Sequence, residues 1–314
     1  MSTTFNAPHF QDEAAARAYV EAIRWPDGPI CNHCGSFGRA YSTKRTGVYR
    51  CAEKECRKDF SVTTGTVMES SHIPLYKWLL GFYLMSSSKK GVSAHQLHRS
   101  LGVTYKSAWF MAHRIREAMR AGGLVPPAPL GGEGKVVEAD ETYFGKAAEM
   151  RVSPQRGDRP FTKRGHFKNN RSIVSLVERG GSVRSFHVAV ADAASVATIV
   201  NENIARESRL HTDESKLYIK VGKNFAAHET ITHSAKEYAR GDVTTNSVEG
   251  YFSILKRGMR GIYQHCGEKH LHRYLAEYDF RFNHRSALGF NDGERAALAV
   301  KGAAGKRLTY RQPH

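Results

Sequence analysis

The sequence predicts a mixed α/β fold, in which one large domain follows two smaller N-terminal units. After a Gly/Pro-rich stretch at 121–135, the pattern changes from helical spacing to runs of β-branched and aromatic residues. Three predicted strands are followed by a helix and a fourth strand, at 135–144, 171–180, 182–191, 194–208 and 209–215. Acidic residues lie at the ends of these strands, and α/β domains place their sites at the carboxyl edge of the sheet.

The overall charge predicts a polyanionic partner. The 314 residues include 47 Lys and Arg against 30 Asp and Glu, a formal net charge of +17. Such an excess favours nucleic acid ahead of a membrane surface.

No segment has the pattern of a membrane or secretory element. The first 20 residues lack the apolar region of a secretory signal. The most apolar stretch, 73–85, is 13 residues long and contains Lys77, whereas spanning a bilayer takes about 20 residues. We therefore expect a cytoplasmic protein that does not bind membranes.

A helix is predicted at 10–24, where apolar residues recur at helical spacing before "WPDGP" ends it. Cysteines then follow in the pattern C-x2-C-x16-C-x4-C: Cys31, Cys34, Cys51 and Cys56. Two close pairs at this spacing are typical of a zinc ribbon, and four thiolates leave no open position on the metal. We predict a structural Zn²⁺ within an N-terminal unit spanning 1–68. Cys266 stands alone and is not assigned to it.

Residues 69–125 are predicted to form a helical unit that includes a helix-turn-helix. Ser93 and Thr104 can cap two helices joined by "LGV". The second helix carries Lys106 and Arg114, which we predict to bind DNA in a major groove. The alternative is an ordinary helix pair whose basic face is only solvated.

Carboxylates from three separate segments are expected to meet in the α/β domain. Asp140 lies in "VVEADETYFG", Asp213 in "HTDES", and Glu249 in the helix that begins near 245. At about 100° per residue, Asn246 lies roughly 60° from Glu249 on that helix, and Lys256 lies within about 20° of Glu249 two turns later. Hard oxygen ligands of this kind suit Mg²⁺ or Mn²⁺, and a pair of such ions can catalyse displacement at phosphorus. Taken one at a time, these residues could equally be surface acids or helix caps.

Two further features belong to the same domain. The insertion 145–170 holds seven Lys and Arg against two Asp and Glu, which fits either a solvated loop or a phosphate clamp. Strand alternation places Glu141 on the face opposite Asp140, and leaves Glu138 on the same face as a possible helper.

Together, "VEADETYFG", "HTDES", "TTNSVEGYFSILKRG" and the cysteine segment resemble bacterial insertion-sequence transposases of the zinc-ribbon-bearing DDE group, the ISXO-two-like family. The resemblance runs from about 10 to 285. It implies a ribonuclease-H-like catalytic domain, here 126–290. The residues after this domain, 291–314, are predicted to form a basic C-terminal tail. The resemblance also implies cutting at element ends and joining of the freed 3′-hydroxyls to target DNA.

By position, Asp140 and Asp213 match the first two catalytic acids of that family. Lys256, with Arg257 beside it, matches the basic residue that contacts DNA. The third catalytic position is Glu249 or Asn246, and we favour Glu249 because a third negative charge offsets a divalent metal better than an amide does.

The resemblance therefore predicts a metal-dependent DNA transposase in the bacterial nucleoid, acting on terminal inverted repeats and target DNA as a homodimer or larger complex. The competing hypotheses are a zinc-ribbon/helix-turn-helix repressor and a catalytically inactive relic. A nuclease of the same fold would cut DNA without joining it.

Overall fold

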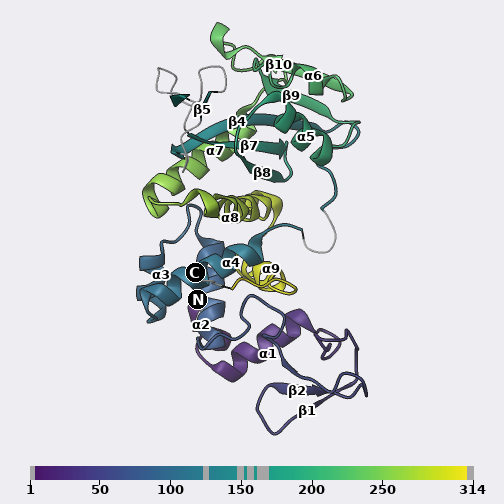
Figure 1. Cartoon of the computed structure of the whole chain (residues 1–314), viewed down its shortest axis with the longest axis vertical. Coiled ribbons are helices and arrows are strands. Elements are labelled where there is room, and N and C mark those ends of the chain that lie inside the picture. Colours follow the sequence, from purple (N-terminus) through teal and green to yellow (C-terminus); the bar gives the residue numbers. More distant parts are fainter. Residues whose placement is uncertain (1–3, 123–126, 147–151, 154–158, 161–169, 310–314) are drawn as a thin grey trace. The chain divides into compact units, whose positions relative to one another are not determined.

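The structure is a computed structural model of the chain, and it describes residues 4–122, 127–146, 152–153, 159–160 and 170–309 (Figure 1). The chain forms two compact units. The first comprises Met1–Leu124 and Gly289–His314, and the second comprises Val125–Leu288.

The first unit begins with α1 (Glu13–Arg24), which is capped by Asp12. The Asp12 carboxylate accepts a hydrogen bond from the Ala15 N–H at 2.8 Å, so the helix starts three residues later than the sequence predicts. A three-stranded antiparallel sheet follows, in the order β1 (Ala40–Ser42), β2 (Val48–Cys51) and β3 (Asp59–Ser61). Trp25 and Phe60 pack edge to face between α1 and this sheet, with ring centroids 5.7 Å apart.

Four helices complete the first unit: α2 (Leu75–Ser87), α3 (Ala94–Leu101), α4 (Tyr105–Met119) and α9 (Asp292–Lys301). The caps predicted for the helix-turn-helix are confirmed, because Ser93 accepts from the Gln96 N–H and Thr104 from the Ser107 N–H. Gly102 ends α3 in the left-handed conformation, at φ 57°, which glycine adopts without steric cost.

The apolar stretch at 73–85 forms most of α2, whose side chains Trp78, Phe82 and Met85 are buried in the core of the first unit. No helix in the described residues is both long and apolar enough to cross a bilayer.

The C-terminal segment differs from the basic tail that the sequence predicts. Residues Asp292–Lys301 form α9, which packs against α2 in the first unit. The buried Arg295 guanidinium donates to the Ser86 carbonyl at 3.2 Å. The helix begins with a capping box between Asn291 and Glu294. This sequence pattern indicates a helix N-terminus, and it was not recognised when 291–314 was interpreted as a basic tail.

The second unit is built on a five-stranded sheet in the order β10-β9-β4-β7-β8. The strands are β4 (Val136–Lys146), β7 (Asn170–Glu178), β8 (Val183–Val188), β9 (Arg209–Asp213) and β10 (Ala227–Ile231). The first three pair antiparallel, whereas β9 and β10 run parallel to β4. This is the ribonuclease-H-like topology, and the mixed α/β prediction is confirmed; β10 was not predicted as a strand.

Helices cover both faces of this sheet (Figure 1). They are α5 (Ala193–Asn203), α6 (Ile219–Gly222), α7 (Asn246–Gly258) and α8 (Leu271–Asn283). Val137 and Ala139 of β4 pack with α5 and α6, whereas Ile173 and Val177 of β7 pack with α7 and α8. The face that carries Glu138 and Asp140 is therefore the α7 face.

Within the basic insertion 145–170, β5 (Val152–Ser153) and β6 (Arg159–Pro160) pair antiparallel. The rest of the segment predicted as a phosphate clamp lies outside the described residues.

Candidate active site

Two aspartates lie at the same level of neighbouring parallel strands: Asp213 ends β9, and Asp140 lies in the middle of the longer β4. In the register of β4 and β9, Glu138 is opposite His211, so Asp140 and Asp213 each lie two residues farther along their strands. Both aspartates therefore reach the same edge of the sheet, where the sequence predicts the site.

Burial and neighbouring charges raise the pKa of acids at this edge. Burial raises the pKa of Asp140 to about 8, and the charges of Asp213, Glu141 and Glu249 add to the effect. Burial likewise raises the pKa of Asp213. Neither aspartate forms an ion pair within the described part of the chain. The edge is thus an acidic cluster that lacks a strong cationic partner and would favour binding a cation.

Glu141 also belongs to this cluster, although alternation along β4 points it away from Asp140. The Ser215 hydroxyl donates to Glu141 Oε1 at 3.3 Å. Burial, and then the charge of Asp213, raise the Glu141 pKa. Since Asp213 lies at the very end of β9, side chains from both faces of β4 can approach it there, which the period-two pattern does not show.

Glu249, the acid favoured for the third catalytic position, comes from the first turn of α7. Glu249 Oε1 accepts from the Thr245 hydroxyl at 3.0 Å and lies 3.2 Å from His233 Nε2. Its charge is one of those that raise the Asp140 pKa. Asn246 is solvent-exposed, and its main-chain N–H donates to the Thr244 hydroxyl at 3.1 Å. His233 is not among the residues that the sequence predicts for the site, because a lone histidine gives no local signal for its partner.

Lys256 follows Glu249 by two turns of α7 and is close enough to Asp140 to interact with its charge. The Lys256 ammonium lies 5.9 Å from the ring centre of Phe252. Burial, and then the charge of Arg260, lower the Lys256 pKa. Arg257 is exposed and donates to the Ser253 hydroxyl at 2.6 Å.

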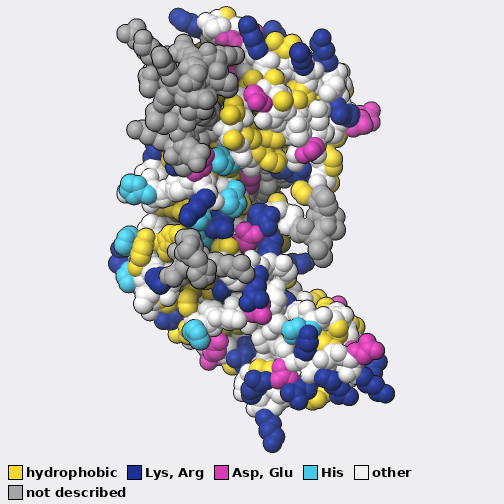
Figure 2. Space-filling model, in the orientation of Figure 1, with side chains coloured by type: hydrophobic (Ala, Val, Ile, Leu, Met, Phe, Trp, Pro, Cys, Tyr) yellow, Lys and Arg dark blue, Asp and Glu magenta, His cyan; other side chains and the backbone are white. Residues whose placement is uncertain are grey.

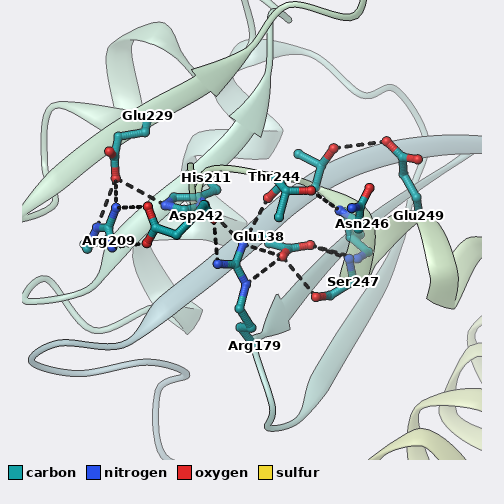
Figure 3. A network of polar contacts seen from close by, with 12 residues as sticks. Glu138, Arg179, Arg209, His211, Glu229, Asp242, Thr244, Asn246, Ser247 and Glu249 are labelled. Atoms are coloured by element: carbon teal, nitrogen blue, oxygen red, sulfur yellow. Dashed lines mark hydrogen bonds and ion pairs between the residues drawn. The ribbon is translucent and has the colours of Figure 1, made fainter. Parts of the chain in front are cut away.

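Glu138 has a different place from the helper predicted on the sequence. Its side chain is 0% exposed and forms an ion pair with Arg179 at 2.9 Å (Figure 3). It also accepts from the main-chain N–H groups of Ser247 and Val248. Both oxygens of the Glu138 carboxylate accept hydrogen bonds from protein groups, so we do not include it among the metal ligands.

The four predicted zinc ligands come together in the first unit. All four sulfur atoms of Cys31, Cys34, Cys51 and Cys56 lie within 4.8 Å of one another. The Cys31–Cys56 and Cys34–Cys51 sulfur distances are 3.7 and 3.6 Å. A tetrahedral zinc with Zn–S bonds of about 2.3 Å requires sulfurs about 3.8 Å apart, so the site fits the ion. No other described group of three or more potential ligands is equally tight, the acidic edge included.

The two DNA-binding candidates on α4 have different surroundings. Lys106 is exposed. Arg114 is partly buried and donates to the carbonyl oxygens of Glu69 and Leu308, at 3.2 and 3.1 Å, while its guanidinium stacks over Phe110. These internal contacts give Arg114 a packing role, and we leave it out of the proposed DNA interface.

Comparisons with known proteins agree with this organisation. Residues 129–283 match the family model of the ISXO2-like transposase domain, and residues 11–59 match the transposase zinc-ribbon domain. A protein of the transposable element ISH50 from Halobacterium salinarum is 29% identical over 287 residues, which is 87% of this chain and 91% of that protein.

Similar solved structures include two complexes of the Mos1 transposase. The Mos1 strand transfer complex is 11% identical in sequence and has a TM-score of 0.22; the match covers 67% of this chain and 77% of the Mos1 chain. The Mos1 mariner paired-end complex with Mn is 12% identical, covers 64% and 75%, and has a TM-score of 0.23. These similarities are too low to define the site.

The ribonuclease-H-like sheet and the matched domains define the class of this protein as a transposase. Within that class, the chain belongs to the ISXO2-like insertion-sequence transposases that carry an N-terminal zinc ribbon.

Proposed function

We propose that this transposase cuts DNA at the ends of its element and joins the freed 3′-hydroxyls to target DNA, and that it needs divalent metal ions to do so. One observation carries the proposal: Asp140, Asp213 and Glu249 come from separate elements to one sheet edge, where burial, and then the charges of neighbouring acids including Asp213 and Glu249, raise the Asp140 pKa to about 8. Carboxylates gathered in this way are unfavourable unless a cation joins them.

The donor set at this edge fits Mg²⁺ or Mn²⁺, because it consists of carboxylate oxygens. Asp140, Asp213 and Glu249 would hold the ions, and Asn246 could contribute its amide oxygen. Bound there, the ions would activate the attacking hydroxyl and stabilise the leaving oxygen in a displacement at phosphorus.

The protein's own residues would orient the DNA strand at this edge. Lys256 is close enough to Asp140 for their charges to interact, and its ammonium can pair with a phosphate beside the cut. His233 and Thr245 both contact Glu249 and restrict its side chain. In the first reaction, the water oxygen bonds to phosphorus and the 3′-oxygen leaves. In the second reaction, that 3′-hydroxyl oxygen bonds to a target phosphorus and displaces the target's 3′-oxygen.

A basic surface on the zinc ribbon would contribute to DNA binding. Figure 2 shows Lys and Arg side chains gathered over this part of the first unit. Exposed basic residues on or beside its strands include Arg39, Lys44, Arg45 and Arg50. We propose that these residues and Lys106 on α4 contact the phosphates of element ends and target DNA from the first unit, and that Arg257 on α7 does so from the second.

We place the protein in the cytoplasm with the nucleoid DNA. Joining two element ends to one target would take a homodimer or a larger complex.

The test is to incubate wild type and Asp213→Asn with a supercoiled plasmid carrying the DNA that flanks the gene, with Mg²⁺, Mn²⁺ or a chelator. We expect ends cut at a fixed inverted repeat and joined products, from wild type with metal only. Asp213→Asn should bind end DNA as wild type does but give no product. Cleavage by this variant would overturn the assignment of Asp213, and cutting without joining would indicate a nuclease. Sequence-specific binding without any product would favour the repressor or the inactive relic.

A further inference from the structure

Glu138 lies at the centre of a network of polar contacts between the sheet and α7 (Figure 3). Its buried carboxylate accepts five hydrogen bonds. Two come from Arg179, at 2.9 and 3.1 Å, and one comes from the Ser247 hydroxyl, at 3.0 Å. The main-chain N–H groups of Ser247 and Val248 supply the other two, at 2.7 and 3.0 Å.

The last two bonds mean that Glu138 caps α7 from another element. The first N–H groups of a helix have no partner within the helix, and its N-terminus favours a negative charge. The residue at the usual capping position, Thr245, makes no capping hydrogen bond with its side chain, and its hydroxyl donates to Glu249 instead. A carboxylate of β4 therefore takes over the role that a local side chain commonly has.

Arg179 extends the same connection to the loop before α7. Its guanidinium donates to the carbonyl oxygens of Asp242 and Thr244, at 2.8 and 3.2 Å. The same group lies 3.3 Å from His211 Nδ1. Arg179 therefore holds the loop that leads into α7 against β4 and β9.

A second arginine, Arg209 of β9, also contacts the loop that leads into α7. Arg209 pairs with Asp242 at 2.6 Å and with Glu229 at 2.7 Å. His211 Nε2 lies 3.2 Å from Glu229, so the imidazole bridges Arg179 and Glu229. Burial, and then the charge of Arg179, lower the His211 pKa, which favours the neutral ring. The start of α7 is thus fixed by a continuous set of contacts.

We propose that Glu138 and Arg179 are positioning residues, which set the first turn of α7, with Asn246 and Glu249, against Asp140 so that the acidic edge can hold metal. This inference rests on the proposed function. Glu138 is two residues from Asp140 on the same strand and face, and it bonds the two residues between Asn246 and Glu249. It therefore couples the two sides of the site without contacting the reacting groups.

The experiment compares wild type with Glu138→Gln and Arg179→Lys in the full-length, zinc-loaded protein. Gln keeps the shape of Glu but loses the charge, and Lys keeps the charge of Arg but loses its fork of donors. The matched control is Glu178→Gln. Glu178 ends β7, pairs with Lys135 at 2.8 Å and accepts from the Gly131 N–H at 3.0 Å. It is therefore an ion-paired glutamate of the same sheet whose two partners lie outside α7.

Three properties are measured: Mn²⁺ affinity without DNA, by calorimetry; hydrogen exchange of the Ser247 and Val248 amides; and the Kd for end DNA. In Glu138→Gln and Arg179→Lys we expect Mn²⁺ binding weakened by about 10- to 100-fold, the size of effect seen when the outer partners of metal ligands are lost. The two amides should lose protection, while α8 keeps its own and the Kd changes less than about twofold. Glu178→Gln should match wild type in all three.

Unchanged Mn²⁺ affinity in Glu138→Gln, or an equal loss in Glu178→Gln, would overturn the positioning role. Loss of protection throughout α8 would show general destabilisation instead and would also overturn it. A wild type that binds Mn²⁺ but yields no DNA product contradicts the proposed function alone, and a wild type that binds no Mn²⁺ contradicts both.

Discussion

Asn246 and Glu249 begin the same helix, yet their surroundings differ. Glu249 contacts Thr245 and His233, and its charge acts on Asp140. Both side chains are exposed, but Asn246 has no charge to offset a divalent ion. At the scale of the residue, we therefore keep Glu249 as the proposed third ligand of the metal site.

We expect Glu249→Gln to lower the rate of metal-dependent end cleavage at least about 100-fold, because a charged metal ligand is replaced by a neutral one. Asn246→Ala should lower it less than about tenfold. Single-turnover cleavage of a labelled end, with binding measured in parallel, compares the two variants. The opposite order of effects would assign the third position to Asn246.

At the scale of the element, the zinc ribbon depends on its metal more than on its core. Its strands have three or four residues each, and Cys31, Cys51 and Phe60 are among its few fully buried side chains. So small a sheet does not bury enough apolar surface to be stable alone. The sulfur geometry supplies what the core lacks, since zinc binding contributes directly to folding.

Cys51→Ser should reduce the zinc content from about one ion per chain to none and unfold the ribbon, because three thiolates no longer close the site. Cys266→Ser is the matched control, since Cys266 lies in the second unit, away from the cluster. Zinc analysis together with hydrogen exchange of β1 to β3 gives the readout. Full zinc content in Cys51→Ser would contradict the assignment.

At the scale of the whole molecule, the net charge of +17 should govern the affinity for DNA. DNA binding that releases counterions weakens as the salt concentration rises, and the slope of log K against log salt is proportional to the number of phosphates neutralised. Lys106, which is exposed, and Arg114, which donates to main-chain carbonyls, lie on the same helix, α4. Substituting each one therefore compares their contributions to the salt dependence of DNA binding.

We expect Lys106→Ala to reduce the slope of log K against log salt by about 0.9, the share of one phosphate contact. Arg114→Ala should leave the slope unchanged, because its guanidinium is held by the carbonyls of Glu69 and Leu308. Fluorescence titrations between about 50 and 200 mM salt cover the range in which such contacts are resolved. A reduced slope for Arg114→Ala would place that residue on the DNA after all.

The sequence by itself determined the features that depend on local chemistry. The spacing of the four cysteines, the caps Ser93 and Thr104, and the strand pattern of the α/β domain all depend on neighbouring residues, and the structure confirms them. The order of Asp140 and Asp213 along predicted strands was enough to place both at one sheet edge.

Only the tertiary structure decided the contacts between residues far apart in the chain. Glu138 caps a helix 109 residues later, Arg114 bonds a carbonyl 194 residues later, and α9 joins the first unit instead of trailing from the second. Local propensity and periodicity carry no information on such partners, because buried polar groups are satisfied by whichever groups the packing brings near. For that reason the acids of the proposed site could be predicted from the sequence, whereas the contacts around them are visible only in the fold.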